Sequence, residues 1–442
     1  MKKLCSILLA LLLVLGSCAM AESPVLLWED ETMYLNTFSN PAGAVSVYSR
    51  NNYGIMTLDG QMLVPLEYAH VSNISCAEGY FILMKGDDIN GASLIDRTGA
   101  LVTSDTYGNI EMLNEDWVIA VKLEVTTDEN YDYWAFGSSD HFNLTSADVY
   151  HIPSGGKVGT FSRADYRSAI PHGDYLLVRD REGGVQLYDA SLAPVDSEFT
   201  SYGQNAFYRT NQGLERDLIV SRITGETVAR GYSYVNDVYL GKYIDVSNED
   251  DLQGLIDDAG TVLLPCEYDD IDEDLGYLQL EKNGLIGLYD LEKQSIVVPC
   301  EYTALVTPDY DFVNYNGYFL MEKDGMIGFV GEDGIATTDF SHEQNAMTLL
   351  GCTMVAANED GTFTLVAADG TVTTLTGVQS VDDDTNASLG RYILVENAEG
   401  LWGIIDWHGN QVVDYIMDYE YDLVFADMTH LIVDDHYLYE IK

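Results

Sequence analysis

The sequence predicts an all-β protein, a β-propeller-like array of about ten units with three to four strands each. Three observations support this prediction. Similar segments recur at intervals of mostly 33 to 41 residues, each segment alternates apolar and polar residues between glycine turns, and sustained helical periodicity is missing beyond the N-terminal leader. One unit cannot bury both faces of its own sheet, so neighbouring units must stack. An open β-solenoid or superhelix is the alternative way to stack them.

The first 21 residues have the pattern of a signal peptide. A lysine pair after the first Met supplies positive charge, residues 7–15 form a short apolar run, and small residues precede a cleavage point before Glu22. The apolar run is too short to span a membrane, and no later stretch reaches the required length. We therefore expect export of a mature chain that covers residues 22–442.

The leader also contains Leu-Gly-Ser-Cys at residues 15–18, which resembles a bacterial lipobox. In that interpretation Cys18 is lipidated and anchors the protein to the membrane surface. Secretion of a soluble protein and lipid anchoring at the cell surface both stay open. Both place the protein outside the cytoplasm.

The repeated units follow one plan along the chain. A first strand ends at an Asn-Gly, Asp-Gly or Glu-Gly turn, a second strand ends at an Asp before a glycine turn, and a third strand is rich in Val, Leu and Ile. Units begin near residues 44, 79, 116, 173, 206, 240, 275, 316, 350, 389 and 428. The interval after 116 is long, so we expect an inserted loop or hairpin at about 122–146.

The last unit stops after two strands, which makes ten units and a fraction. Its two strands, at 431–433 and 437–439, are apolar enough to need a partner. An incomplete terminal unit closes a propeller when a strand from the other end of the chain completes it. We expect the N-terminal run Val25–Leu27 to be that strand.

The segment Trp-Gly-Ile-Ile-Asp at residues 402–406, with a glycine turn at Gly409, resembles the repeat of the WG-repeat (KWG-type) family of bacterial repeat proteins. Other units keep the glycine and replace the tryptophan, as at Gly287 and Gly328. One such motif is a weak signal, but units in phase along the whole chain are a strong one. The resemblance implies an extracytoplasmic repeat scaffold that binds a ligand, and it supplies no catalytic residues.

The charge balance excludes some partners. Asp and Glu number 72 against 21 Lys and Arg, which gives a net charge of −51. Such a surface repels phosphate backbones, so we expect no binding of nucleic acid or anionic lipid. Four cysteines outside the leader are too few for a disulfide scaffold. Cys266 and Cys300 occupy equivalent positions and are expected to be buried thiols, with a disulfide between them as the alternative.

Acidic residues have a simple structural explanation at several positions. An Asp recurs after the second strand of five units, at Asp96, Asp189, Asp257, Asp290 and Asp406. Such a side chain accepts hydrogen bonds from backbone N–H groups two or more residues further along a turn. Glu67, Glu267 and Glu301 occupy equivalent unit ends, which indicates a shared packing or hydrogen-bonding role rather than a single active site.

The densest acidic segment spans residues 269–274. Within it Asp270, Asp272 and Asp274, together with Glu281, have the spacing of a calcium-binding loop. Leu275 stands where such a loop needs glycine, and no helices flank the segment. We expect a solvent-exposed loop between units, with a calcium site as the alternative. No other cofactor is expected.

Aromatic residues give the best candidate for a contact surface. Most of the 31 tyrosines occupy repeat positions, where packing between units explains them. The residues Tyr131, Tyr133, Trp134 and Phe136 lie in the expected insertion, which no repeat constrains. Insertions on repeat scaffolds often carry binding function, and aromatic side chains dominate binding surfaces.

The sequence lacks the motifs of serine hydrolases, P-loop NTPases and zinc hydrolases. We therefore expect no enzyme activity, and a non-catalytic scaffold that binds a protein or a glycan at or near the bacterial cell surface. The alternative is an extracellular glycan-processing enzyme that uses a pair of carboxylates. A purely structural spacer is a third interpretation.

Overall fold

The computed structural model describes most of the chain. The described residues are 24–38, 43–74, 79–86, 89–127, 132–134, 141–195, 199, 202–210, 218–274, 276–307, 313–382, 390–419, 423–427 and 429–441. The expected signal peptide, Cys18, Tyr131 and Phe136 lie outside these ranges.

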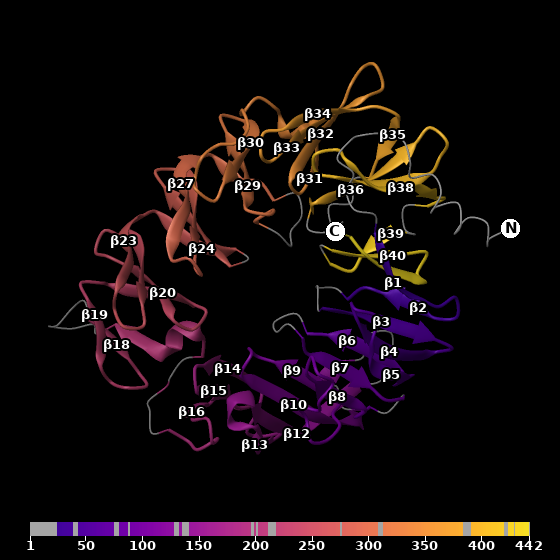
Figure 1. Cartoon of the computed structure of the whole chain (residues 1–442). Coiled ribbons are helices and arrows are strands. Elements are labelled where there is room, and N and C mark those ends of the chain that lie inside the picture. Colours follow the sequence, from indigo (N-terminus) through magenta and orange to yellow (C-terminus); the bar gives the residue numbers. More distant parts are fainter. Residues whose placement is uncertain are drawn as a thin grey trace.

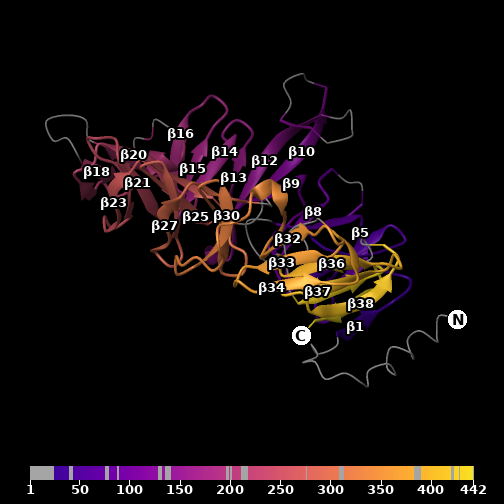
Figure 2. The same cartoon turned by 90° about the horizontal axis from the view of Figure 1, so that it is seen from above.

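The described residues form eleven small antiparallel sheets arranged in a ring (Figure 1). Within them the chain forms 41 strands and three short 3-10 helices, η2 (Ile152–Ser154), η3 (Gln204–Phe207) and η4 (Gln344–Ala346), and no α-helix. The prediction of an all-β, propeller-like array is confirmed. Figure 2 shows the ring from above, with β18 and β38 towards opposite ends of the molecule.

The strands are grouped into sheets in chain order. The first three sheets contain β2 (Tyr34–Asn36), β3 (Ala44–Ser49), β4 (Asn52–Thr57) and β5 (Met62–Tyr68); β6 (His70–Asn73), β7 (Phe81–Met84) and β8 (Ala92–Ile95); and β9 (Asn109–Met112), β10 (Trp117–Thr126), β11 (Tyr133–Trp134), β12 (His141–His151) and β13 (Gly156–Ser162). The next four contain β14 (Ser168–His172), β15 (Tyr175–Arg179) and β16 (Val185–Tyr188); β17 (Tyr208–Thr210), β18 (Leu218–Ser221) and β19 (Thr227–Arg230); β20 (Tyr234–Tyr239), β21 (Tyr243–Ser247), β22 (Gln253–Asp257) and β23 (Val262–Tyr268); and β24 (Asp270–Asp274), β25 (Tyr277–Lys282), β26 (Leu285–Asp290) and β27 (Ser295–Tyr302). The last four contain β28 (Ala304–Leu305), β29 (Tyr318–Lys323) and β30 (Met326–Gly331); β31 (Thr348–Leu350), β32 (Thr353–Ala357), β33 (Phe363–Ala367) and β34 (Val372–Leu375); β35 (Val378–Val381), β36 (Tyr392–Asn397), β37 (Trp402–Asp406) and β38 (Gln411–Met417); and β39 (Leu423–Phe425), β40 (His430–Val433) and β41 (Tyr437–Glu440) with β1 (Val25–Glu29).

Sheets and sequence units are offset by one strand. Most predicted units begin at the second strand of a sheet, as β21 and β25 do. The first strand of each such sheet belongs to the end of the preceding unit, and in Figure 1 strands β9 and β24 lie on the inner side of their sheets. Ten sheets therefore come from continuous chain, and the fraction left over at the C-terminus forms part of the eleventh.

The N-terminal strand closes the ring as predicted. Strand β1 pairs antiparallel with β41, with Val25 opposite Glu440 and Leu26 opposite Tyr439. Buried Leu438 of the closing sheet packs in one cluster with Val47 of the first sheet. The open solenoid alternative is thus wrong for this chain, because both ends contribute to one sheet.

The hydrophobic core is divided into layers between consecutive sheets. One layer joins Tyr243 and Leu255 of one sheet to Leu278, Leu280 and Tyr289 of the next. Equivalent layers recur around the ring, and the middle strands contribute to the layers on both sides of their sheet. In β29, for example, Phe319 and Met321 pack in one layer and Leu320 packs in the next. The array is held together by burial of these layers, which no isolated sheet could achieve.

The motif glycine lies where the fourth strand of a sheet crosses close to the third. A Cβ atom on Gly254 would lie 2.8 Å from both the carbonyl oxygen of Leu264 and the amide nitrogen of Cys266. The pairing of β22 with β23 shifts register here, between Gln253 and Leu255, as at a β-bulge. Gly54, Gly287 and Gly403 meet the backbone of their own fourth strands in the same way. The repeat needs glycine because the outer strand leaves no room for a side chain.

A second glycine, in the turn after the third strand, touches the preceding sheet. Gly260 has φ +82°, and a Cβ atom there would lie 2.0 Å from the carbonyl oxygen of Val228 in β19. At the ring closure a Cβ atom on Gly60 would likewise lie 3.1 Å from the carbonyl oxygen of Leu27 in β1. Strand β1 therefore occupies the place of a fourth strand.

The recurrent Asp residues cap these turns, which confirms the prediction. Asp257 accepts a hydrogen bond from the Thr261 amide at 2.6 Å, and Asp406 accepts one from the Asn410 amide at 2.8 Å. The carboxylates of Asp96, Asp189 and Asp290 accept equivalent backbone bonds.

The cysteines are free thiols, so the disulfide alternative is wrong. The Cys266 thiol donates to the carbonyl of Val246 at 3.7 Å, and the Cys300 thiol donates to the carbonyl of Leu280 at 3.5 Å. Each thiol thus bonds within its own sheet. Burial raises the pKa of both thiols, so they stay protonated and inert.

Candidate functional site

The most irregular part of the ring is the hairpin of β10 and β12, which we call the extended hairpin (residues 117–151). The two strands pair from Trp117 opposite His151 to Thr126 opposite His141. Strand β9 pairs only with residues 118–121 of β10, so the far half of the hairpin runs beyond β9. In Figure 2 this half rises out of the ring. The expected insertion lies in it.

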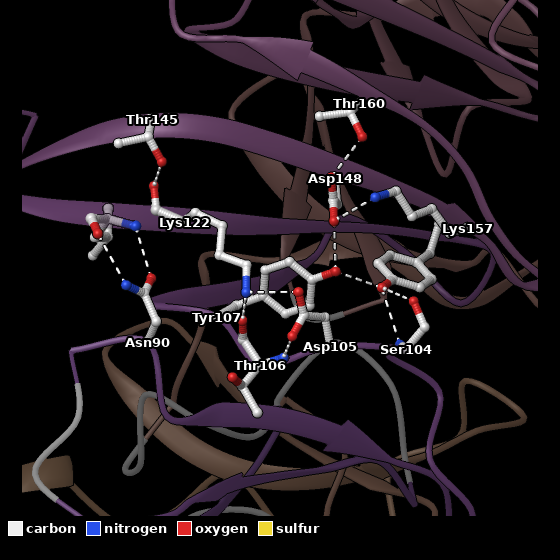
Figure 3. A network of polar contacts seen from close by, with 12 residues as sticks. Asn90, Ser104, Asp105, Thr106, Tyr107, Lys122, Thr145, Asp148, Lys157 and Thr160 are labelled. Carbon is white, nitrogen blue, oxygen red and sulfur yellow. Dashed lines mark hydrogen bonds and ion pairs between the residues drawn. The ribbon is translucent and has the colours of Figure 1, made fainter.

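The near end of the extended hairpin is held by a buried polar network (Figure 3). Tyr107 donates a hydrogen bond to Asp148 Oδ2 at 2.6 Å, and its hydroxyl lies 2.6 Å from that of Tyr150. Lys157 of β13 lies 2.7 Å from the same carboxylate oxygen, and the Thr160 hydroxyl donates to the other at 2.6 Å. Both tyrosines are fully buried. The network fastens β12 to β13 and to the segment before β9.

The protonation states of the network are fixed by its geometry. Burial raises the pKa of Tyr107, and the hydrogen bond to Asp148 raises it further. Burial also acts to raise the pKa of Asp148, but hydrogen bonds from Lys157, Thr160 and Tyr107 outweigh it and lower the pKa. Tyr107 therefore keeps its proton and Asp148 its charge. The arrangement suits a structural role, because every acid or base in it is already engaged.

Beyond residue 121 of β10, where pairing with β9 ends, side chains hold the hairpin in place (Figure 3). The Lys122 ammonium donates to a backbone carbonyl, lies 2.9 Å from Asp105 Oδ2, and sits 4.8 Å from the centroid of the Tyr107 ring. The Asn90 amide exchanges two hydrogen bonds, of 2.8 and 2.9 Å, with the backbone of Leu123. The middle of the hairpin is thereby fixed without a neighbouring strand.

The far end is fixed by one buried carboxylate, Asp132. Its Oδ2 accepts hydrogen bonds from Arg163 Nε at 3.2 Å and from the Leu144 amide at 2.9 Å, and its Oδ1 pairs with Arg181 Nη1. Its own amide donates to the Phe142 carbonyl at 3.0 Å. The side chain of Asp132 is only 4% exposed. We call Asp132, Arg163 and Arg181 the clamp.

The clamp spans two sheets. Arg163 follows β13 of the same sheet, whereas Arg181 follows β15 of the next one. Burial acts to raise the pKa of Asp132, but Arg181, the Leu144 amide and Arg163 outweigh it and lower the pKa. The carboxylate therefore stays charged, and two guanidinium groups offset the cost of burying it. The inserted segment is held against the boundary between the two sheets.

The structure places two of the four predicted contact residues at this end. Tyr133 and Trp134 form β11, which pairs with Phe142 and His141 of β12. Sequence reasoning identified the segment but missed Asp132, which lies between two of its aromatic residues. It also missed the arginines, because they are 31 and 49 residues away along the chain.

The acidic segment at 269–274 is not a loop, and that prediction is wrong. Asp270–Asp274 forms β24, which pairs with β25 so that Asp270 lies opposite Glu281. Residues two apart in a strand lie about 6.5 Å from each other, so Asp270 and Asp272 are spread along the strand. Among the described residues no group of three or more His, Cys, Asp or Glu is placed to hold a metal ion. The spacing that resembles a calcium loop therefore has a different cause.

That cause is the inner position of β24. Ile271 is the one apolar residue of the run and is buried in the layer between two sheets, whereas Asp270 and Asp272 are exposed. The alternation of a half-buried strand explains the pattern.

Comparison with known protein families finds one repeat match. Residues 254–285 match the family model described as WG containing repeat. The match runs from the motif glycine in β22 to the start of β26. No curated protein sequence matches this chain.

Several solved structures are similar in outline. One is the crystal structure of a eukaryotic initiation factor, with a TM-score of 0.33, 10% identity, and coverage of 72% of this chain and 90% of the other. Another is BamB from Moraxella catarrhalis, with a TM-score of 0.22, 11% identity, and coverage of 84% and 96%. At these scores the similarity supports no argument about function.

Within the described ranges, no helix has the length and hydrophobicity that crossing a membrane requires. The strongest finding is the repeat match, which falls on the most regular units of the ring. The resemblance that the repeat motifs indicate is thereby confirmed for residues 254–285, which match a WG containing repeat.

Proposed function

We propose that this chain is an exported, non-catalytic scaffold that binds a protein or a glycan at or near the bacterial cell surface. The observation that carries the proposal is the extended hairpin, which departs from the repeat and is fastened at both ends. A ring of repeats alone needs no such element. Two buried ionic arrangements, at Asp148 and at Asp132, hold it in place.

The rigidity of the hairpin favours a binding role. A surface that is ordered before it meets its ligand loses less conformational entropy on binding. Asp132 of the clamp directly precedes β11, whose two residues, Tyr133 and Trp134, are aromatic. We infer that these aromatic side chains make the contact. The N-terminal leader supports export, and with it a ligand outside the cytoplasm.

The network chemistry supports the non-catalytic part of the proposal. A general acid or base needs a pKa near the working pH and a free site for the reacting proton. Tyr107 and Asp148 are shifted away from that range in opposite directions, and both are hydrogen-bonded within the fold. We therefore propose that they stabilise the hairpin.

The test is binding of residues 22–442 to a panel of glycans and bacterial cell-wall fractions, each with calcium and with a chelator. We expect saturable binding without product formation. Trp134→Ala should weaken it at least tenfold, which corresponds to about 1.4 kcal/mol. The matched control is Tyr419→Ala. This aromatic residue follows β38 and is 66% exposed, so the variant should bind as the parent does.

Three outcomes contradict the proposal. Turnover of any glycan refutes the non-catalytic function. Equal losses for Trp134→Ala and Tyr419→Ala would show that the insertion is not the contact surface. Absence of binding to every fraction would favour a spacer.

A further inference from the structure

One buried carboxyl group lies in the second strand of its sheet. Asp245 lies in β21 and is 2% exposed. In the strands that begin with Tyr277, Tyr318 and Tyr392, the equivalent residues are Gln279, Leu320 and Leu394, and the two leucines are 0% and 6% exposed. An acid therefore occupies a position where two other sheets bury a leucine and the next sheet has a neutral polar residue.

Asp245 lies at the boundary between the sheet of β20–β23 and the sheet of β24–β27, which we call the seam. Side chains alternate along a strand, so Asp245 shares a face with Tyr243. Tyr243 packs in the apolar layer with Leu278 and Leu280 of the next sheet. A charge at this place loses its hydration, and the apolar layer offers little in return.

Among the residues that the structure describes, one neutral hydrogen-bond donor serves the carboxyl group. Asn236 Nδ2 donates to Asp245 Oδ1 at 3.1 Å, and the same nitrogen also donates to the Ser247 hydroxyl at 2.7 Å. No described cation forms an ion pair with Asp245. The buried Asp148 differs, because Lys157 lies 2.7 Å from it.

The titratable groups around Asp245 are acidic on every side. Strand β20 contributes the Asp237 carboxylate and the Tyr239 phenol, and β23 contributes the Cys266 thiol. Strand β24 contributes Asp270, which itself lies opposite Glu281 of β25. Ionisation of Asp245 would add a further negative charge to this group.

Burial raises the pKa of Asp245 to about 7. The hydrogen bond from Asn236 opposes this shift, and the charges of Asp270 and Asp237 add to it. In the unfolded chain an Asp has a pKa of about 3.9. The folded state thus binds the proton more tightly. Its contribution to stability is complete below the unfolded pKa and is lost as the pH rises towards the folded pKa.

We propose that the seam is a pH-sensitive joint of the ring, closed while Asp245 is protonated and loosened when Asp245 ionises. The strand next to the seam is β24, which lies on the inner side of its sheet in Figure 1 and carries the exposed residues Asp270 and Asp272. Ionisation weakens the packing that holds this strand. The ring therefore has one boundary that is tighter in mildly acidic surroundings.

Hydrogen exchange of residues 22–442 at pH 5.5 and pH 8.5, corrected for intrinsic exchange rates, tests the proposal. For a carboxyl group with pKa values of about 7 closed and about 3.9 open, the opening constant of the seam should rise about 30-fold between these pH values. The amides of β21 and β24 should lose protection accordingly. Those of β36 and β37, in a sheet with Leu394 at the equivalent position, should not.

Two variants make the result specific to Asp245. Asp245→Asn keeps the shape without the charge and should abolish the pH dependence at the seam. Asp245→Leu, which copies Leu320, should do the same if the amide is poorly tolerated. Asp237→Asn removes an exposed neighbouring carboxylate and should keep most of the effect. The proposal is overturned if Asp245→Asn retains the parent's pH dependence, or if β36 and β37 lose protection equally.

Discussion

The sheet of β24–β27 and the sheet of β9–β13 are built to the same plan but held by different groups. The first relies on glycine contacts, capped turns and apolar layers that recur around the ring. It also buries Asp290, which pairs with Lys293 three residues further along the chain. The second sheet adds two ionic arrangements, at Asp148 and at Asp132, and the one at Asp132 joins residues that are far apart in the sequence. The repeated sheet is stabilised mainly by interactions that recur in other sheets. The irregular sheet has side-chain bonds of its own, and these hold an element that the repeat does not need.

The largest effect should come from breaking a contact between regular sheets. Gly260→Ala places a Cβ atom 2.0 Å from the Val228 carbonyl oxygen, at φ +82°, and neither backbone can move freely. We expect a loss of about 3 kcal/mol or more in the free energy of unfolding, measured by urea denaturation.

Gly284→Ala is the matched control for that contact. Gly284 has φ +74° but nothing within 4 Å of the Cβ position, so it should cost only the left-handed strain of about 1 kcal/mol. Equal losses for the two variants would show that the contact between sheets contributes nothing beyond strain.

The next prediction compares the loss of a buried tyrosine hydroxyl in each of the two sheets. Tyr107→Phe removes a hydroxyl that bonds Asp148 and Tyr150, so we expect a loss of about 1–3 kcal/mol. Tyr289 of β26 is also buried, but its hydroxyl has no hydrogen-bond partner among the described residues. Tyr289→Phe should therefore leave stability unchanged or raise it slightly. Thermal unfolding of both variants checks the contrast, and a neutral Tyr107→Phe would contradict the role of the network.

The regular sheets were largely predictable from sequence, for physical reasons. A period of 33 to 41 residues imposes the same local pattern on every unit, so the caps at Asp257 and Asp406 and the strand pairs could be read directly. The incomplete last unit indicated that Val25–Leu27 closes the ring, and it does. The acidic run at 269–274 was misread because one buried residue, Ile271, decides between strand and loop.

The extended hairpin was predictable only as an irregularity. The long interval between two units indicated where the hairpin lies. It did not indicate which side chains hold the hairpin in place. Tyr107 and Asp148 are 41 residues apart, and Asp132 and Arg181 are 49 apart. No repeat copy exists that would show these residues to be equivalent, so only the folded chain brings them together. The same holds for Asp245, whose burial is visible only once β20 and β24 are placed around it.

Acid should affect the two regions in opposite directions. The pKa values of Asp132 and Asp148 are lowered in the fold, so their contribution is present above the unfolded pKa and lost as the pH falls through the folded values. The seam at Asp245 becomes more stable as the pH falls, because Asp245 takes up its proton. Hydrogen exchange at pH 5 and pH 3, corrected for intrinsic rates, should show the hairpin losing protection before β21. Loss in the reverse order would contradict this assignment.

The smallest effect should come from an exposed ion pair whose N···O distance is nearly the same as that of the buried pair. Lys282 lies 2.8 Å from Glu267, and Lys157 lies 2.7 Å from Asp148. The carboxylate of Glu267 is 47% exposed, whereas that of Asp148 is 8% exposed. Water and salt screen the first pair, so Glu267→Gln should cost no more than about 0.5 kcal/mol, and less at high ionic strength.

Lys157→Met removes the cation from the buried carboxylate and should cost about 3 kcal/mol, with little dependence on salt. Urea denaturation at low and high salt measures both variants. If Glu267→Gln proved as costly as Lys157→Met, burial would not be what distinguishes the two regions. The distances alone are nearly equal, so the two pairs differ in exposure and in the hydrogen bonds that Asp148 also accepts from Tyr107 and Thr160.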